Sequence, residues 1–195
     1  IPAHKDFRPA EDALAITRVK DAGGVILGKT NVPLALSDWQ SYNEIYGTTN
    51  NPYHLARTPG GSSGGSSAAL AAGYGALSLG SDIGGSLRVP AFHCGVYAHK
   101  PTFDLAAMRG HTPPPLPALP SNRDLSVIGP MARCAADLSL LLDVIAGPDP
   151  LDAEVVRWMG PPEPDPAVRP LGFLLDPALE VPGAPAPPPS PPHHR

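Results

Sequence analysis

Two glycine-rich turns that contain serine carry the residues of this sequence best suited to chemistry. The first lies in "PGGSSGGSSAALAAG" and contains Ser62, and the second lies in "LGSDIGGSLRVP" and ends at Ser86. A glycine-rich turn at the start of a helix directs several backbone N–H groups at one point, where they can stabilise a developing oxyanion beside a nucleophile. The pattern therefore predicts that Ser86 is a nucleophile at a strand-to-helix turn.

Short helices and strands should hold these turns in place. Residues 66–73 favour an alanine-rich helix with serine caps that is closed by Gly73. Residues 76–82 are typical of a strand, and residues 87–94 of a second helix with Pro90 in its first turn. A flexible Gly/Ser linker does not alternate with strand and helix patterns, so we expect the turns to belong to a folded domain.

A serine of this kind needs a base, because its hydroxyl is a weak nucleophile at neutral pH. Histidine is the usual base, and the sequence contains seven. None of them lies in a local motif, and two, His193 and His194, lie at the C-terminal end. The residues alone therefore leave the base unassigned.

The two serine turns, read together with "VPAFHCGVYAHKPT" after the second, resemble the amidase signature family over about residues 9–150. The resemblance implies a Ser-cisSer-Lys unit, in which Ser86 is the nucleophile and Ser62, preceded by a cis peptide bond, passes the proton to a lysine. The oxyanion hole would be formed by the backbone N–H groups of Ile83, Gly84, Gly85 and Ser86.

The same resemblance implies the fold and the activity. The fold would be α/β, a mixed sheet flanked by helices, of which this chain is the central and incomplete part. The activity would be hydrolysis of non-peptide C–N amide bonds in small molecules through an acyl-enzyme, with no metal and no cofactor.

The lysine of that unit has no clear place among the four lysines of this sequence. Lys20 ends an exposed helix, Lys29 follows a strand, and Lys100 lies beyond the second turn. Lys5 lies in "HKDF", which imitates the Lys-Asp pair of the family, but the glycine- and threonine-rich connection that the family places after this pair is missing. We therefore expect the catalytic lysine to lie outside this chain, and the chain alone to have little or no amidase activity.

Proline marks the C-terminal part. Of the 28 prolines, 21 lie after residue 110, and seven of them lie in "PGAPAPPPSPP". Such a stretch forms neither a helix nor an inner strand. We expect a partial amidase-signature domain over residues 1–180 and an extended or disordered tail over residues 181–195.

One motif suggests a different class of protein. "GGVILGKT" matches the phosphate-binding loop, which requires a strand before it and a helix that starts at its lysine. Here a helix predicted from Pro9 leads into the motif and is closed by Gly23, and Pro33 would break a helix that starts at Lys29. Residues 25–27 instead favour a buried strand. The motif therefore predicts helix, cap and strand, not nucleotide binding.

Composition excludes several other classes. The net charge is -4 and no lysine or arginine cluster is present, which argues against nucleic acid and anionic membranes as partners. No apolar run approaches the ~18 residues that span a bilayer, so we expect a cytoplasmic protein. Cys94 and Cys134 lie far apart, and the spacing of His93, Cys94 and His99 fits no standard metal site, which favours buried structural residues.

Two functional alternatives and two substrate contacts remain open. The chain could be the amidase subunit of a tRNA-dependent amidotransferase, although "RGHTPPPLPALPSNRDLSVIGP" does not resemble the shorter connection of that subunit, or a non-catalytic fragment of a disrupted gene. Arg88 is a candidate for binding a substrate carboxylate, against a structural role. Trp39, Gln40 and Tyr42 either line a pocket or pack on the helix after the first turn.

Overall fold

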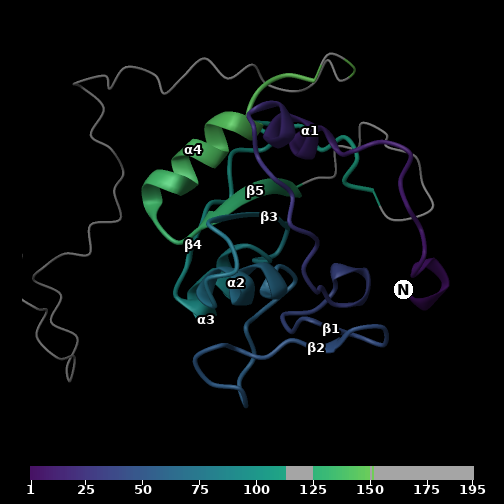
Figure 1. The fold of residues 1–195 in the computed structure, drawn as a ribbon, viewed down its shortest axis with the longest axis vertical. Helices are drawn as coiled ribbons and strands as arrows, with labels where there is room; N and C mark the ends of the chain where they lie inside the picture. The colour runs from purple at the N-terminus through teal and green to yellow at the C-terminus, as the bar shows by residue number, and fades with distance from the viewer. Residues whose placement is uncertain (113–124, 150, 152–195) are drawn as a thin grey trace, which may run out of the picture. The chain divides into compact units, whose positions relative to one another are not determined.

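The computed structural model describes residues 1–112, 125–149 and 151, and all elements below lie in these ranges (Figure 1). The chain divides into two units, Ile1–Trp158 and Met159–Arg195. The described residues all belong to the first unit. The predicted tail at 181–195 and the domain boundary at 180 lie outside the described residues, as does most of the proline-rich connection before residue 127.

A three-stranded antiparallel sheet lies at the centre of this unit. Strand β5 (Val127–Ala132) lies between β3 (Leu77–Asp82) and β4 (Tyr97–Ala98). Gly80 of β3 lies opposite Gly129 of β5, and all six residues of each strand are paired with the other strand. The predicted strand at residues 76–82 is therefore confirmed as β3, and the α/β class is confirmed by the helices that flank the sheet.

Helices cover both faces of the sheet. Figure 1 shows α1 (Leu14–Asp21) and α4 (Ala135–Ile145) on one side, and α2 (Gly64–Ala71) and α3 (Arg88–Cys94) on the other. Successive side chains of a strand point to opposite faces, so β5 contributes to two buried clusters. The first contains Ala15, Ala106, Met108, Ile128, Leu141 and Ile145, and the second contains Leu70, Leu87, Ala91 and Met131. Within the described ranges, no helix is both long and apolar enough to cross a membrane.

Four short elements lie in the N-terminal part of the chain. Two are 3-10 helices, η1 (Pro2–His4) and η2 (Leu34–Leu36). The other two are the strands β1 (Tyr42–Asn43) and β2 (Gly47–Thr48), which pair antiparallel in a small separate sheet. Element η2 leads directly into the wall of the candidate site described below.

Helix α1 begins later than the predicted start at Pro9. Its first residue is Leu14, and the preceding residue, Ala13, has an extended backbone. The Leu14 N–H donates to the carbonyl of Arg109, and a Cβ at Gly110 would lie 2.7 Å from the Cβ of Ala13. This close contact with a segment distant in sequence holds the chain before Leu14 extended, which a helix propensity does not reveal.

The end of α1 agrees with the prediction. Gly23 has φ of +87°, its N–H donates to Lys20 O at 2.9 Å, and the N–H of Gly24 donates to Val19 O at 2.8 Å. This pair of hydrogen bonds is the Schellman arrangement, which needs a left-handed residue and therefore favours glycine. The prediction that Gly23 closes the helix is confirmed.

The strand predicted next is absent from the structure. Residues 25–27 belong to no strand, and Val25 and Leu27 are 82% and 80% exposed. A strand gains its stability from a hydrogen-bonded neighbour and a covered face. Neither is provided by the described residues, so the prediction of a buried strand is wrong for this chain.

The helix after the first serine turn begins earlier than predicted and lacks the predicted caps. Helix α2 begins at Gly64, before the predicted residue 66, and the hydroxyl of its N-cap residue, Ser63, makes no capping hydrogen bond. The main-chain N–H of Ser63 instead donates to Ser86 O. The predicted closure is confirmed, because Gly73 has φ of +81° and donates to Leu70 O.

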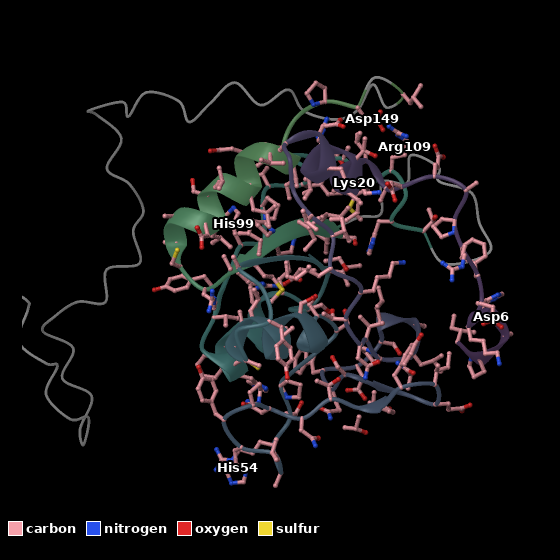
Figure 2. All side chains as sticks on the ribbon, in the orientation of Figure 1. Asp6, Lys20, His54, His99, Arg109 and Asp149 are labelled. Atoms are coloured by element: carbon pink, nitrogen blue, oxygen red, sulfur yellow. The ribbon has the colours of Figure 1, made fainter. Side chains whose placement is uncertain are left out.

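A charged cluster joins α1 to the end of α4. Arg18 donates to the carbonyl oxygens of Ile145 at 2.7 Å and Pro148 at 2.6 Å. The side chains of Arg109 and Asp149, which Figure 2 labels, form an ion pair of 2.6 Å. The last carbonyl groups of a helix have no intrahelical partner, and Arg18 supplies a donor to Ile145 O at the end of α4, which ties α1 to α4.

Candidate active site

The carboxylate of Asp82 holds the turn in which Ser86 lies. Asp82 is the last residue of β3 and is 1% exposed. Its Oδ1 accepts a hydrogen bond from the N–H of Gly85 at 2.8 Å, and its Oδ2 accepts one from the N–H of Leu87 at 3.0 Å. The guanidinium of Arg88 donates to both oxygens, at 3.1 and 3.0 Å. The end of β3 and the start of α3, predicted at residue 87, are thereby joined around Ser86.

These contacts decide the charge of Asp82. Burial opposes ionisation, but the hydrogen bonds from Arg88, Gly85 and Leu87 outweigh it and hold the pKa of this carboxyl below its ordinary value. The sequence patterns did not single out Asp82. The available signal was an aspartate placed just before a Gly-Gly-Ser turn, since Asp side chains commonly accept hydrogen bonds from amides a few residues ahead.

One of the N–H groups predicted to form the oxyanion hole is hydrogen-bonded to Asp82. Of the four predicted donors, the N–H of Gly85 is already occupied by the Asp82 carboxylate. Ile83, Gly84 and Ser86 line a pocket. A buried carboxylate binds an N–H strongly, so the Gly85 N–H helps to shape the turn, and its role as an oxyanion donor stays a prediction.

Ser62 lies in the neighbouring turn and is buried beside Ser86. The peptide bond between Gly61 and Ser62 is cis, as the family resemblance implied. Ser62 is 2% exposed and Ser86 is 8% exposed, and the Ser63 N–H donates to Ser86 O at 3.1 Å. The described hydrogen bonds include none between the Ser62 and Ser86 hydroxyls. The structure therefore brings the two turns together, and proton transfer between the hydroxyls stays a prediction.

The segment after η2 packs against the first turn. A Cβ at Gly61 would overlap the carbonyl oxygen of Asp38 and lie 2.9 Å from the Gln40 nitrogen. The buried hydroxyl of Ser41 donates to Gly60 O at 3.2 Å and Ser62 O at 3.4 Å. Glycine at position 61 is therefore required by close backbone packing.

A pocket of 370 Å³ opens beside Ser86. One wall comes from the end of η2 and the residues after it, and the other from the turn between β3 and α3. Its lining residues are Leu36, Ser37, Asp38, Trp39, Ile83, Gly84 and Ser86. A nucleophile candidate at the edge of a concave site is the arrangement expected of an enzyme that binds a small molecule.

Of the residues proposed to contact substrate, Trp39 lines this pocket, and Gln40, Tyr42 and Arg88 are not among its lining residues. The Gln40 side chain contacts the Thr58 hydroxyl and donates to Thr49 O at 3.3 Å. Tyr42 lies in β1. Arg88 is paired with Asp82, which supports the structural interpretation, although its side chain is 57% exposed. Its role in substrate binding stays a prediction.

None of the four lysines has a described contact with Ser62. Lys20, labelled in Figure 2, projects from α1 and pairs with Asp12 at 2.5 Å. Lys100 donates to Leu125 O at 3.0 Å. Lys5 directly follows η1, and Lys29 is exposed. The described residues thus place a nucleophile candidate and a neighbouring serine together without a lysine bonded to them.

The three residues considered as metal ligands differ in their exposure to solvent. Cys94 is fully buried, its thiol donates to Pro59 O, and burial raises its pKa to about 11. His93 and His99 are exposed, which corrects the prediction that they are buried. His93 and Cys94 are neighbours on α3. Because successive residues of a helix are ~100° apart around its axis, the His93 side chain can be exposed to solvent while the Cys94 side chain is buried. In the part of the chain that the structure describes, no three His, Cys, Asp or Glu residues gather to hold a metal ion.

Comparisons identify the class of protein. The Amidase family profile matches residues 1–171, and the chain belongs to this family. The chain is 48% identical to a glutamyl-tRNA(Gln) amidotransferase subunit of Thermus thermophilus over 76% of its own length and 30% of the relative. The chain therefore spans about 30% of the length of this relative.

Solved structures show the same relationship. The structure of 6-aminohexanoate cyclic dimer hydrolase has a TM-score of 0.66 and 38% identity, covering 75% of this chain and 30% of that one. A bacterial aryl acylamidase of the amidase signature family has a TM-score of 0.69 and 28% identity, covering 80% and 31%. The expected family is therefore confirmed.

Proposed function

We propose that this chain forms the acylating part of an amide hydrolase, in which Ser86 attacks the carbonyl carbon of a linear, non-peptide amide. Ser62 takes the hydroxyl proton of Ser86 and passes it on, and the oxyanion is bound by the N–H groups of Ile83, Gly84 and Ser86. The C–N bond then breaks, ammonia or an amine leaves with a proton, and water releases the acid from the acyl-enzyme. No metal or cofactor takes part in this scheme.

The observation that carries this proposal is the turn held by Asp82. A carboxylate that is buried and hydrogen-bonded to the amides of Gly85 and Leu87 keeps Ser86 at the edge of the pocket. Fixed donors around a nucleophile are effective because they need no reorganisation as charge develops. Membership of the Amidase family supports the same chemistry.

The proton acceptor beyond Ser62 is proposed to be a lysine outside this chain. The support is positional, because Lys20 and Lys100 are bonded elsewhere and neither Lys5 nor Lys29 has a described bond to Ser62. Loss of one member of a catalytic unit typically lowers the reaction rate by several powers of ten. The missing lysine is such a member. The chain alone should therefore react slowly.

Covalent labelling tests the proposal without requiring turnover. A fluorophosphonate should label the chain slowly and at Ser86, as located by mass spectrometry after proteolysis. Ser86→Ala should abolish this label, whereas Ser62→Ala should slow it only slightly in this chain, because the members of a catalytic unit are not additive and the unit already lacks its base. Ser139→Ala, on α4, is the matched control and should label like the parent chain. Label that persists in Ser86→Ala would refute the assignment of the nucleophile.

A second candidate is the amidase subunit of a tRNA-dependent amidotransferase. It is favoured by the 48% identity to the amidotransferase subunit from Thermus thermophilus. The distinguishing property is the amide that acylates Ser86. Protection of Ser86 from the fluorophosphonate by glutamine, but not by other linear amides at equal concentration, would favour this candidate over the general amide hydrolase.

A further inference from the structure

Several hydrogen bonds and close contacts hold the segment that forms one wall of the pocket beside Ser86. The Thr58 hydroxyl donates to the side-chain oxygen of Gln40, with Trp39 O as a more distant acceptor at 3.4 Å, and the Ser37 hydroxyl donates to Leu34 O at 2.9 Å. The indole nitrogen of Trp39 lies 3.8 Å from the position that a Cβ would take at Gly85. The backbone of Asp38 lies against Gly61 of the first turn and the indole of Trp39 lies near Gly85 of the second, so this segment contacts both serine turns.

Asp38 is the one charged residue among those that line the pocket. Among its lining residues, Asp38 alone has an ionisable carboxyl group, and none is lysine, arginine or histidine. The nearest arginine along the chain from Ser86, Arg88, is already paired with Asp82. Asp38 forms no ion pair among the described residues, so it contributes an unpaired carboxylate to the lining of this pocket.

The remaining lining residues are aromatic or aliphatic. Trp39 is 59% exposed, Ile83 is 58% exposed and Leu36 is 40% exposed, so each offers apolar surface to a ligand. A protonated amine is attracted both by a carboxylate and by the face of an indole ring. An anionic substrate would be repelled by the Asp38 carboxylate, and no lysine, arginine or histidine lines the pocket to offset this repulsion.

We propose that this pocket selects amides that carry a protonated amine next to an aromatic or aliphatic group, with Asp38 as the ion-pair partner and Trp39 as the cation–π surface. This inference rests on the proposed function for the statement that the ligand is a substrate, and it names the class of that substrate. Asp38 and Trp39 are specificity-determining residues in this arrangement, and the amide group lies toward Ser86.

Binding to the full chain tests the inference with two matched probes. Phenylalaninamide carries the amine, and 3-phenylpropanamide is the same molecule without it. At about pH 6, where an α-amine is protonated, phenylalaninamide should bind the chain at least about fivefold more tightly, as measured by NMR titration. The difference should shrink with added salt, because screening weakens exposed ion pairs.

Variants assign the effect to the pocket. Asp38→Asn should remove the preference for phenylalaninamide, and Asp38→Glu should restore part of it. Trp39→Leu should weaken the binding of phenylalaninamide more than that of 3-phenylpropanamide. Asp143→Asn, an exposed change on α4, is the matched charge control and should change neither.

The outcomes separate this inference from the proposed function. Equal binding of the two probes, or a preference that survives Asp38→Asn, would overturn the inference even if Ser86 is labelled as proposed. Ser86→Ala should keep the preference, because binding does not need the hydroxyl. A preference that persists while fluorophosphonate labelling of Ser86 fails would leave the binding site standing and refute the proposed function.

Discussion

The two serine turns and the segment at residues 23–30 are both rich in glycine and bordered by apolar residues, but they differ in how they are covered. A Cβ at Gly61 would collide with the backbone of residues 38–40, whereas one at Gly23 would meet nothing within 4 Å. Leu87, directly after Ser86, is fully buried, whereas Leu27 is 80% exposed. The serine turns are therefore supported by contacts within this chain, and residues 25–27 have no such support among the described residues.

The largest expected effect is the difference in stability between alanine variants of two leucines, Leu87 and Leu27. Leu87→Ala should lower the free energy of unfolding by about 3 kcal/mol, because it removes a side chain packed with Leu70 and Met131. Leu27→Ala should change it by less than about 0.5 kcal/mol. Urea titration followed by circular dichroism measures both. Similar losses for the two variants would show that residues 25–27 are covered in solution.

Alanine variants of two glycines in the serine turns, Gly61 and Gly84, should differ in stability. Gly61→Ala should cost about 2–3 kcal/mol, because its new methyl group meets backbone atoms that cannot move independently. Gly84→Ala should cost much less, because nothing lies within 4 Å of its Cβ position. Thermal unfolding of both variants provides the measurement. Equal melting temperatures would contradict the tight packing of residues 38–40 on the first turn.

The carboxylate of Asp82 links stability to pH. Asp82→Asn should destabilise the chain by about 2 kcal/mol at neutral pH, because a buried, hydrogen-bonded charge loses its match with Arg88. The folded pKa of Asp82 is lowered, so its contribution is present above the ordinary carboxyl pKa of about 4 and is lost as pH falls through the folded value. Unfolding experiments between neutral and acidic pH should therefore show a smaller loss on acidification in Asp82→Asn, and Asp143→Asn should behave as the parent chain does.

The smallest expected effect concerns the lysines. Lys5→Ala, Lys20→Ala, Lys29→Ala and Lys100→Ala should each leave the rate of fluorophosphonate labelling at Ser86 unchanged, because the proposed proton acceptor is not among them. Loss of labelling in Lys5→Ala would show that the "HKDF" sequence supplies the base. Labelling kinetics followed by intact-protein mass spectrometry measure all four variants.

The elements around the site were predictable where local signals decide them. Glycine at positions 23 and 73 predicted helix ends, because a left-handed backbone is accessible to glycine at little cost. The strand β3 and the helix α3 followed from local apolar and turn patterns. The start of α1 was not predictable, because the carbonyl of Arg109, far along the chain, binds the first helical amide.

The sequence by itself determined the two serine turns, the helices and strand that border them, and the resemblance to the amidase signature family, because these depend on residues close together along the chain. Only the tertiary structure decided that Asp82 ties the Ser86 turn to α3, that Gly85 is occupied by this carboxylate, and that Asp38 and Trp39 face the same pocket as Ser86. Each of these features joins side chains and backbone groups whose meeting depends on the path of the folded chain, since a hydrogen bond or a pocket requires the partners to meet in space and no local pattern specifies that meeting.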